Sequence, residues 1–152
     1  MLFRSILYMT HKAISKFVIA KLDCFSITND IDFMEKYGYE ILLDTGIFWG
    51  SRFQWNEDKQ RYHIENVIGP DEYKEHVNND AFTNHTAFWC VENAILFYQE
   101  IKEKKPQVFE ILNQKLNLDE EIGILKEKLK TLAQLIPMTI PQWSFQVDLV
   151  PH

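Results

Sequence analysis

Apolar residues recur at helical spacing through the first third of the chain. From about residue 11 to 25 they predict an amphipathic helix, with apolar positions at Ile14, Phe17, Val18, Ala20 and Leu22. After "SITND", where Thr28, Asn29 or Asp30 can cap a helix, a second stripe predicts a helix from about 30 to 52. That stripe is wide enough to be buried on more than one side. Gly38 and Gly46 lie inside it, so either another helix packs closely there or the helix is interrupted.

The second half of the chain predicts three further helices. One begins near Thr83 or Asn84 and ends near Lys104, where clustered lysines suit a helix C-terminus. Pro106 starts the next, over about 106–116. An acidic run at 119–121 opens the last, over about 119–135. From Pro137 onward the pattern dissolves and no element is predicted.

Between these helices, "FQWNEDKQRYHIENV" has a different pattern. Two short runs, at residues 53–55 and 61–64, flank the polar stretch "NEDKQ", which predicts a small β-hairpin. No internal repeat, low-complexity segment or linker divides the chain. The predicted class is mainly α with one small β-hairpin, in a single unit over residues 1–152.

Composition excludes several classes of function. The chain has 152 residues, of which 46% are hydrophobic and 14% aromatic, enough to bury a core. The formal net charge of -6 offers no basic patch for phosphates, so a nucleic-acid partner is not expected. Cys24 and Cys90 lack metal-ligand spacing and are expected to be buried, reduced thiols.

The N-terminal stretch "MLFRSILYMTHKAISKFVIAKL" does not have the pattern of a targeting or membrane segment. His11, Lys12 and Lys16 interrupt its apolar run, and no small-residue cleavage site follows an unbroken apolar stretch. The run is also too broken to span a bilayer. We therefore expect a cytoplasmic protein without a membrane partner.

Residues 64–80, "IENVIGPDEYKEHVNND", concentrate polar groups between apolar helices. Gly69 and Pro70 favour an extended-to-turn transition, and the adjacent acids Asp71 and Glu72 follow. Such a stretch is either a solvated surface turn or a loop whose acids point into a pocket. Aromatic and aliphatic residues interleave the polar ones, which favours partial burial. A carboxyl group in such surroundings would have a raised pKa and could act as a general acid.

Other candidate residues carry weaker signals. His63 lies in the predicted hairpin and is expected to be structural. His76 and His85 are nine positions apart with no third ligand nearby, so no metal site is predicted. The sequence contains no glycine-rich phosphate loop, no G-x-S-x-G elbow and no cysteine paired with a nearby histidine.

Two longer stretches, "YGYEILLDTGIFWGSRFQW" and "RYHIENVIGPDEYKEHVNNDAFTNHTAFWCVENAI", resemble the catalytic region of glycoside hydrolase family 65. The family pattern is a helix ending in "E-T/I-A-R-F-W-x-S-R", a short hairpin, "G-P-D-E-Y", a doubled asparagine and "A-Y/F-T-N" opening the next helix. "TNDIDFMEKYG" is similar to the family's "TGDxxFLxxYG", and His11 stands where the family commonly has a histidine. The resemblance covers about residues 8–100 and is most specific from Gly69 to Asn84.

The family contains inverting phosphorylases that act on maltose, trehalose, kojibiose and related α-glucosides. The resemblance implies a partial (α/α)6-barrel in which the polar loop opens into the sugar-binding pocket. The family's general acid, the glutamate of "GPDEY", maps onto Glu72. It would protonate the glycosidic oxygen while inorganic phosphate attacks the anomeric carbon from the opposite face, giving β-glucose 1-phosphate. The partners implied are a disaccharide and phosphate as co-substrate, with no cofactor or metal.

By the same resemblance, further residues of the loop are expected to bind substrate or to support the acid: Asp71, Lys74, Glu75, Asn78 and Asn79. The stretch "GPDEYKEHV" favours the kojibiose-type members, although the disaccharide itself is not decided. Departures from the family pattern are Asp44 for glutamate, Gly46 for alanine and Ile47 for arginine. The last removes a charged group that could brace the hairpin.

The family's upstream Trp-Asp segment, its downstream "K-Q-A-D" segment and its phosphate-binding loop do not occur in this sequence. We therefore expect residues 1–152 to be a fragment of the catalytic barrel domain, with a divergent tail at about 136–152. Alternatives remain open: a truncated product without activity, a helical interaction protein, or a hydrolase of the same family. The chain alone is expected to be inactive and to be weakly stable or self-associating, because barrel helices without their neighbours expose apolar stripes.

Overall fold

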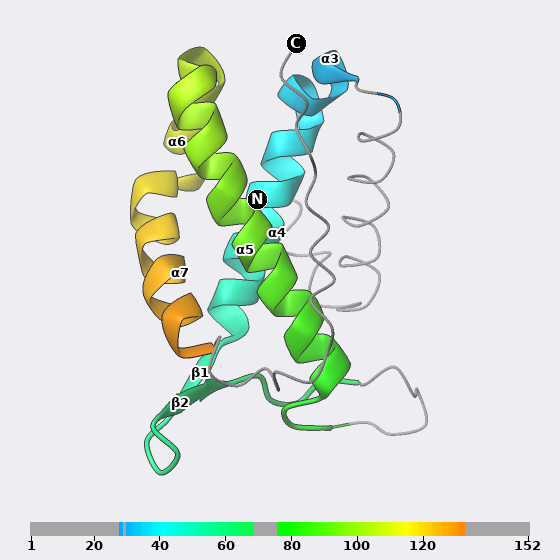
Figure 1. The fold of residues 1–152 in the computed structure, drawn as a ribbon, viewed down its shortest axis with the longest axis vertical. Coiled ribbons are helices and arrows are strands. Elements are labelled where there is room, and N and C mark those ends of the chain that lie inside the picture. The colour runs from blue at the N-terminus through cyan, green and yellow to red at the C-terminus, as the bar shows by residue number, and fades with distance from the viewer. Residues whose placement is uncertain (1–27, 29, 69–75, 133–152) are drawn as a thin grey trace.

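The computed structural model describes residue 28, residues 30–68 and residues 76–132 (Figure 1). In chain order its elements are α3 (Ile31–Phe33), the π-helix η1 (Met34–Gly38), α4 (Tyr39–Arg52), β1 (Gln54–Asn56), β2 (Arg61–His63), α5 (Ala81–Lys104), α6 (Pro106–Leu116) and α7 (Leu118–Leu132). The prediction of a mainly helical chain with one hairpin is confirmed. The helix predicted at about 11–25 and the tail after Pro137 lie outside the described residues.

The core forms where α4, α5 and α7 meet. Figure 1 shows α4 and α5 crossing the centre in opposite directions, with α7 beside them. Each of these helices contributes large side chains that are almost fully buried; they include Leu43, Trp49, Val91, Ile101, Ile122 and Leu125. Cys90 is buried in this core, as predicted, whereas Cys24 lies outside the described residues. Within the described ranges, no helix has both the length and the apolar character needed to cross a membrane.

Two glycines of α4 allow neighbouring helices to approach closely. A Cβ atom on Gly46 would lie 2.3 Å from the Cβ of Ala94 and 3.3 Å from the carbonyl oxygen of Cys90, both on α5. A Cβ atom on Gly50 would lie 1.9 Å from a methyl carbon of Leu125 on α7. Close packing therefore accounts for Gly46, which the sequence left open.

The helix predicted at about 30–52 is interrupted once. Residues 34–38 form a turn of π-helix, in which the N–H of Tyr39 donates to the carbonyl of Met34, five residues earlier. The Met34 side chain folds over Gly38, where an added Cβ would lie 2.3 Å from its sulfur atom. Such single π turns insert an extra residue that an apolar stripe does not reveal.

Helix α5 begins at Ala81, earlier than the predicted start near Thr83 or Asn84. The residue that caps it is Asp80, whose carboxylate accepts from the backbone N–H of Thr83 at 2.7 Å and from its hydroxyl at 2.8 Å. Asp80 satisfies part of the helix N-terminus. It also joins the long central helix directly to the end of the polar loop.

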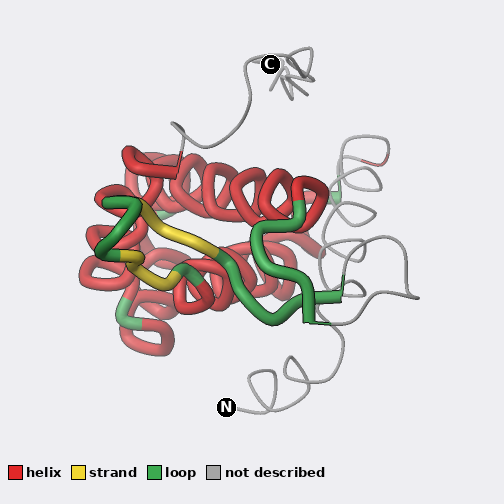
Figure 2. The backbone as a smooth tube through the Cα atoms, turned by 90° about the horizontal axis from the view of Figure 1, so that it is seen from below, coloured by secondary structure: helices red, strands yellow, loops and turns green. Residues whose placement is uncertain are grey.

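The hairpin lies at the end of the bundle where α4 ends and α5 begins (Figures 1 and 2). Its antiparallel register pairs Gln54 with His63, Trp55 with Tyr62 and Asn56 with Arg61. Lys128 of α7 fastens this end of the fold. Its Nζ donates to the carbonyl of Gly50 at 2.9 Å and lies 5.5 Å from the centroid of the Tyr62 ring.

Candidate active site

The polar loop connects the hairpin to α5. The short backbone segments at its two ends are hydrogen-bonded to each other. Val67 and Val77 form an antiparallel bridge, in which Val67 N donates to Val77 O at 3.0 Å and Val77 N donates to Val67 O at 2.8 Å. We call residues 63–67 together with residues 76–79 the neck. The neck brings together the two described residues that flank segment 69–75, Ile68 and His76.

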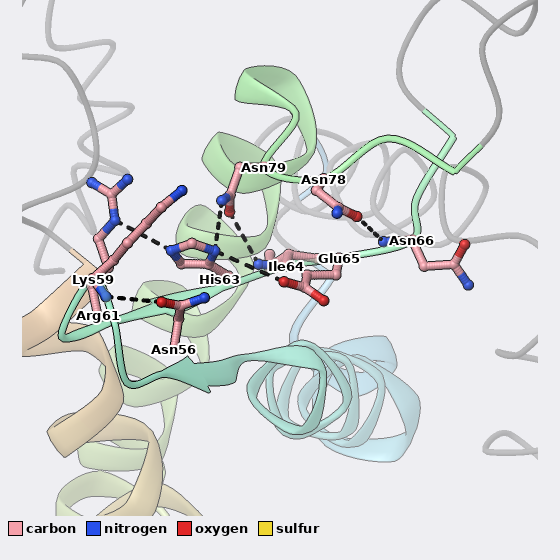
Figure 3. Close-up of polar contacts among 9 residues, drawn as sticks. All are labelled: Asn56, Lys59, Arg61, His63, Ile64, Glu65, Asn66, Asn78 and Asn79. Carbon is pink, nitrogen blue, oxygen red and sulfur yellow. Dashed lines mark hydrogen bonds and ion pairs between the residues drawn. The ribbon is translucent and has the colours of Figure 1, made fainter.

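Asn79 contacts two other residues of the neck, Ile64 and His63. Its backbone N–H donates to the carbonyl of Ile64 at 2.8 Å, and its Oδ1 accepts from the N–H of Ile64 at 3.3 Å. Its Nδ2 lies 2.9 Å from Nδ1 of His63 (Figure 3). Asn79 has a positive φ of 55°, a conformation that asparagine adopts more readily than most residues. One asparagine therefore holds both backbone groups of Ile64 and the ring of His63.

The neighbouring polar side chains close the rest of the neck. Asn78 Oδ1 accepts from the N–H of Asn66 at 2.9 Å, and the side chain of Asn66 contacts the ring of His76. Both Asn66 and His76 have a φ of 57°. From the end of α4, Arg52 Nη2 donates to the carbonyl of Glu65 at 2.9 Å. Side chains thus bond backbone groups that a regular sheet would otherwise pair.

His63 is the buried titratable group of the neck, with 4% of its surface exposed. The Nε of Arg61 lies 3.2 Å from its Nε2, and the amide nitrogen of Asn79 lies beside its Nδ1 (Figure 3). Both neighbouring groups are donors; a neutral ring can accept from one of them, whereas a protonated ring, with N–H on both nitrogens, can accept from neither. Burial, followed by the charges of Lys59 and Arg61, lowers the pKa of His63, and Glu65 opposes the shift. Burial and the neighbouring donors therefore both favour the neutral form of His63.

Of the residues that the sequence assigns to the site, Asn78 and Asn79 are described, and both bond to the backbone on the other side of the neck. Asp71, Glu72, Lys74 and Glu75 lie outside the described residues. Among the residues that the structure describes, no three His, Cys, Asp or Glu side chains gather as a metal ion would require.

Sequence reasoning did not single out Arg52 or Asn66 as parts of this arrangement. Arg52 ends a helix, where an arginine usually needs no special explanation, and its target is a backbone carbonyl that no motif announces. The spacing of Asn66 and Asn79 at the two borders of the loop was the available signal. Asparagine at a loop border often marks a left-handed residue.

The model that describes the glycosyl hydrolase family 65 central catalytic domain matches residues 10–134. The chain belongs to glycoside hydrolase family 65. The family 65 match includes both sides of the neck, the hairpin, the described helices and segment 69–75 with its "GPDEY" motif.

Two relatives of the chain are much longer proteins. A kojibiose phosphorylase of Caldanaerobacter subterraneus subsp. tengcongensis is 42% identical over 120 residues, which are 78% of this chain and 16% of that protein. A maltose phosphorylase of Bacillus subtilis is 33% identical over 95 residues, 62% of this chain and 12% of that protein. The chain therefore spans about one sixth of the first of these relatives.

A solved family 65 structure shows the same fold for most of the chain. It is that of a putative kojibiose phosphorylase from human microbiome, with a TM-score of 0.58 and 29% sequence identity. The superposition covers 71% of this chain and 15% of that protein. As with the sequence relatives, this chain corresponds to a short part of a larger family 65 enzyme.

Proposed function

We propose that this chain forms part of the catalytic domain of an inverting disaccharide phosphorylase. The reaction converts an α-linked glucose disaccharide and phosphate into β-glucose 1-phosphate and the released sugar. The observation that carries this proposal is the family 65 match across the neck, with "GPDEY" between its two ends. The helices and hairpin then belong to an (α/α)6-barrel, of which residues 1–152 supply one part.

In this proposal Glu72 is the general acid. It gives its proton to the glycosidic oxygen as the bond to the anomeric carbon breaks, so that the released sugar leaves as a neutral alcohol. Phosphate attacks the same carbon from the opposite face and inverts it. Phosphate arrives as an anion, so no second carboxylate is needed to activate a water molecule.

The remaining loop residues divide into two groups. Asp71, Lys74 and Glu75 are proposed to line the sugar pocket beside Glu72. Asn78 and Asn79 are proposed to support the loop, because their side-chain oxygens already accept from backbone N–H groups of Asn66 and Ile64. An oxygen that accepts such a bond is less available to a sugar hydroxyl.

Kojibiose is the first substrate to test, since two relatives at 42% identity carry the name kojibiose phosphorylase. Trehalose and maltose follow, because relatives at 36% and 33% identity are named for those sugars. The proposed function requires the rest of a family 65 barrel, so the chain by itself is expected to be inactive.

The test uses a chimera of the Caldanaerobacter enzyme in which the 120 matched residues are replaced by those of this chain. Glucose 1-phosphate is measured with each disaccharide and phosphate, for the chimera, for its Glu72→Gln variant and for the isolated chain. The proposal expects product from the chimera and a loss of about 10²- to 10⁴-fold in the variant. A folded chimera without product, or a Glu72→Gln variant with full activity, contradicts it.

A further inference from the structure

The ring of His63 lies between two alternative partners at the end of β2. Its Nδ1 is 2.9 Å from the side-chain nitrogen of Asn79 and 4.0 Å from a carboxylate oxygen of Glu65 (Figure 3). The histidine is buried, whereas 40% of the Glu65 side chain is exposed. One partner is therefore an uncharged amide inside the neck, and the other is a carboxylate that reaches solvent.

The protonation state of the ring determines which partner it can bond. When Nδ1 carries no proton, it accepts from the Asn79 amide and has no N–H to donate to Glu65. A protonated ring has an N–H on Nδ1, which cannot bond the amide NH₂ group but can donate to the carboxylate. The same ring nitrogen therefore bonds Asn79 or Glu65 according to whether it carries a proton.

Asn79 cannot follow the ring by turning its amide over. Its Oδ1 accepts from the backbone N–H of Ile64 at 3.3 Å, and Ile64 is fully buried. A reversed amide would place NH₂ against this N–H and leave a buried donor without an acceptor, which is costly. The Asn79 side chain therefore presents a donor to His63 whether or not the ring is protonated.

We propose that His63 is a pH-sensitive switch in the neck: its neutral ring bonds Asn79, and its protonated ring separates from Asn79 and pairs with Glu65. The backbone of Glu65 is already fixed, because Arg52 Nη2 donates to its carbonyl at 2.9 Å, so only the Glu65 side chain has to move. Protonation removes a contact between the end of the hairpin and the residue that precedes the Asp80 cap of α5. The switch uses described residues alone and does not depend on the proposed function.

The surroundings of the ring determine the pH range of the switch. Burial, followed by the charges of Lys59 and Arg61 in the hairpin, lowers the pKa of His63, and Glu65 opposes the shift. On the side of α5 the ring faces the uncharged Asn79, and the guanidinium group from the end of α4 is bonded to a backbone carbonyl. The change of partner is therefore expected as the pH falls below about 6.5, the ordinary pKa of histidine.

Two carboxylates allow a matched test. Glu65→Gln removes the charge of the alternative partner and keeps the shape of the side chain. Glu57→Gln removes the same charge from the exposed turn of the hairpin, where the Glu57 carboxylate contacts Gln60. Both side chains reach solvent, so both variants are expected to fold. A third variant, Asn79→Asp, replaces the donor beside Nδ1 by a carboxylate, which favours the protonated ring.

The experiment records imidazole and amide resonances of the full ¹⁵N-labelled chain between about pH 4.5 and pH 8. In the parent, the side-chain NH₂ of Asn79 and the backbone N–H of Ile64 should titrate with the same midpoint as the His63 imidazole. The Overhauser contact between the Asn79 NH₂ protons and the His63 ring should disappear below that midpoint. Glu65→Gln should move the midpoint to lower pH, Asn79→Asp should move it to higher pH, and Glu57→Gln should leave it in place.

Three results would overturn the switch. A His63 ring that stays neutral over the whole range would show that it does not titrate. An Overhauser contact with Asn79 that persists below the midpoint would show that the protonated ring keeps its first partner. Equal midpoints in the parent and in Glu65→Gln, or equal shifts in Glu65→Gln and Glu57→Gln, would show that Glu65 is not the second partner.

Discussion

Replacing Gly46 by alanine tests the close approach of α4 and α5. The added Cβ would lie 2.3 Å from the Cβ of Ala94 and 3.3 Å from the carbonyl oxygen of Cys90. Neither atom belongs to the far end of a flexible side chain, so a rotamer change cannot relieve the contact. The two central helices must separate, which loosens the packing of the core around them.

The magnitude follows from two opposing effects. Overpacking a well-packed core costs roughly 1–3 kcal/mol, and a contact this short between atoms tied to backbone belongs at the upper end. This cost is offset by about 1 kcal/mol, because alanine stabilises a helix more than glycine does. We therefore expect Gly46→Ala to lower the free energy of unfolding by about 2 kcal/mol.

The assay is urea unfolding of the full chain, followed by circular dichroism. Gly123→Ala on α7 is the matched control, because an added Cβ there meets nothing within 4 Å. It should raise the free energy of unfolding by up to about 1 kcal/mol. Ala94→Gly should destabilise the parent by about 1 kcal/mol but be neutral or stabilising in the Gly46→Ala background.

A Gly46→Ala variant that is as stable as the parent would refute this reasoning. Equal changes of the same sign in the free energy of unfolding at Gly46 and Gly123 would also refute it, because only the methyl group at Gly46 meets a neighbouring helix. Additivity of Gly46→Ala and Ala94→Gly would show that the two positions do not touch.

Three further predictions concern other parts of the fold. Because burial and the nearby cations lower the pKa of His63 below its ordinary value of about 6.5, the unfolded chain binds more protons just below that pH. Stability should therefore fall as the pH decreases through about 6.5, and His63→Gln should remove that part of the dependence in urea titrations at a series of pH values. Tyr98→Phe removes a hydroxyl that donates to Asp119 at 2.5 Å and accepts from Lys102 at 2.8 Å, and should cost about 1 kcal/mol of unfolding free energy in the same assay. Leu96 is 56% exposed on α5, so Leu96→Glu should reduce self-association of the isolated chain in sedimentation equilibrium, whereas a parent that stays monomeric at every concentration would contradict the expected association.

Helical spacing of apolar residues predicted the long helices, and two short runs around a polar stretch predicted the hairpin. The helix predicted at about 106–116 coincides with α6, where Pro106 begins the helix and Asn117 ends it in a left-handed conformation. The π turn at 34–38 could not be predicted, because it depends on how Met34 folds over Gly38. The start of α5 was placed late because Thr83 and Asn84 are also good capping residues, and only the structure shows that Asp80 does the capping.

The candidate site was less predictable than the fold. The family motifs indicate Glu72 and the doubled asparagine as site residues. They do not indicate which groups the asparagine side chains form hydrogen bonds with. Asn79 contacts His63, sixteen residues earlier in the chain, and Asn66 bonds Asn78 across the same reversal. Such contacts depend on left-handed residues on both sides of the loop, which local patterns do not specify. The sequence predicts a structural role for His63, and the structure shows its ring buried beside Asn79.

In the proposed reaction Glu72 donates the proton to the departing sugar. The most direct test compares two substrates in the chimera and in its Glu72→Gln variant, with phosphate present in both. Kojibiose needs a proton on its leaving oxygen, whereas α-glucosyl fluoride releases an ion that leaves without one. We predict a loss of about 10²- to 10⁴-fold with kojibiose and a change within about tenfold with the fluoride. Equal losses with both substrates, or no loss with either, would contradict the role of Glu72.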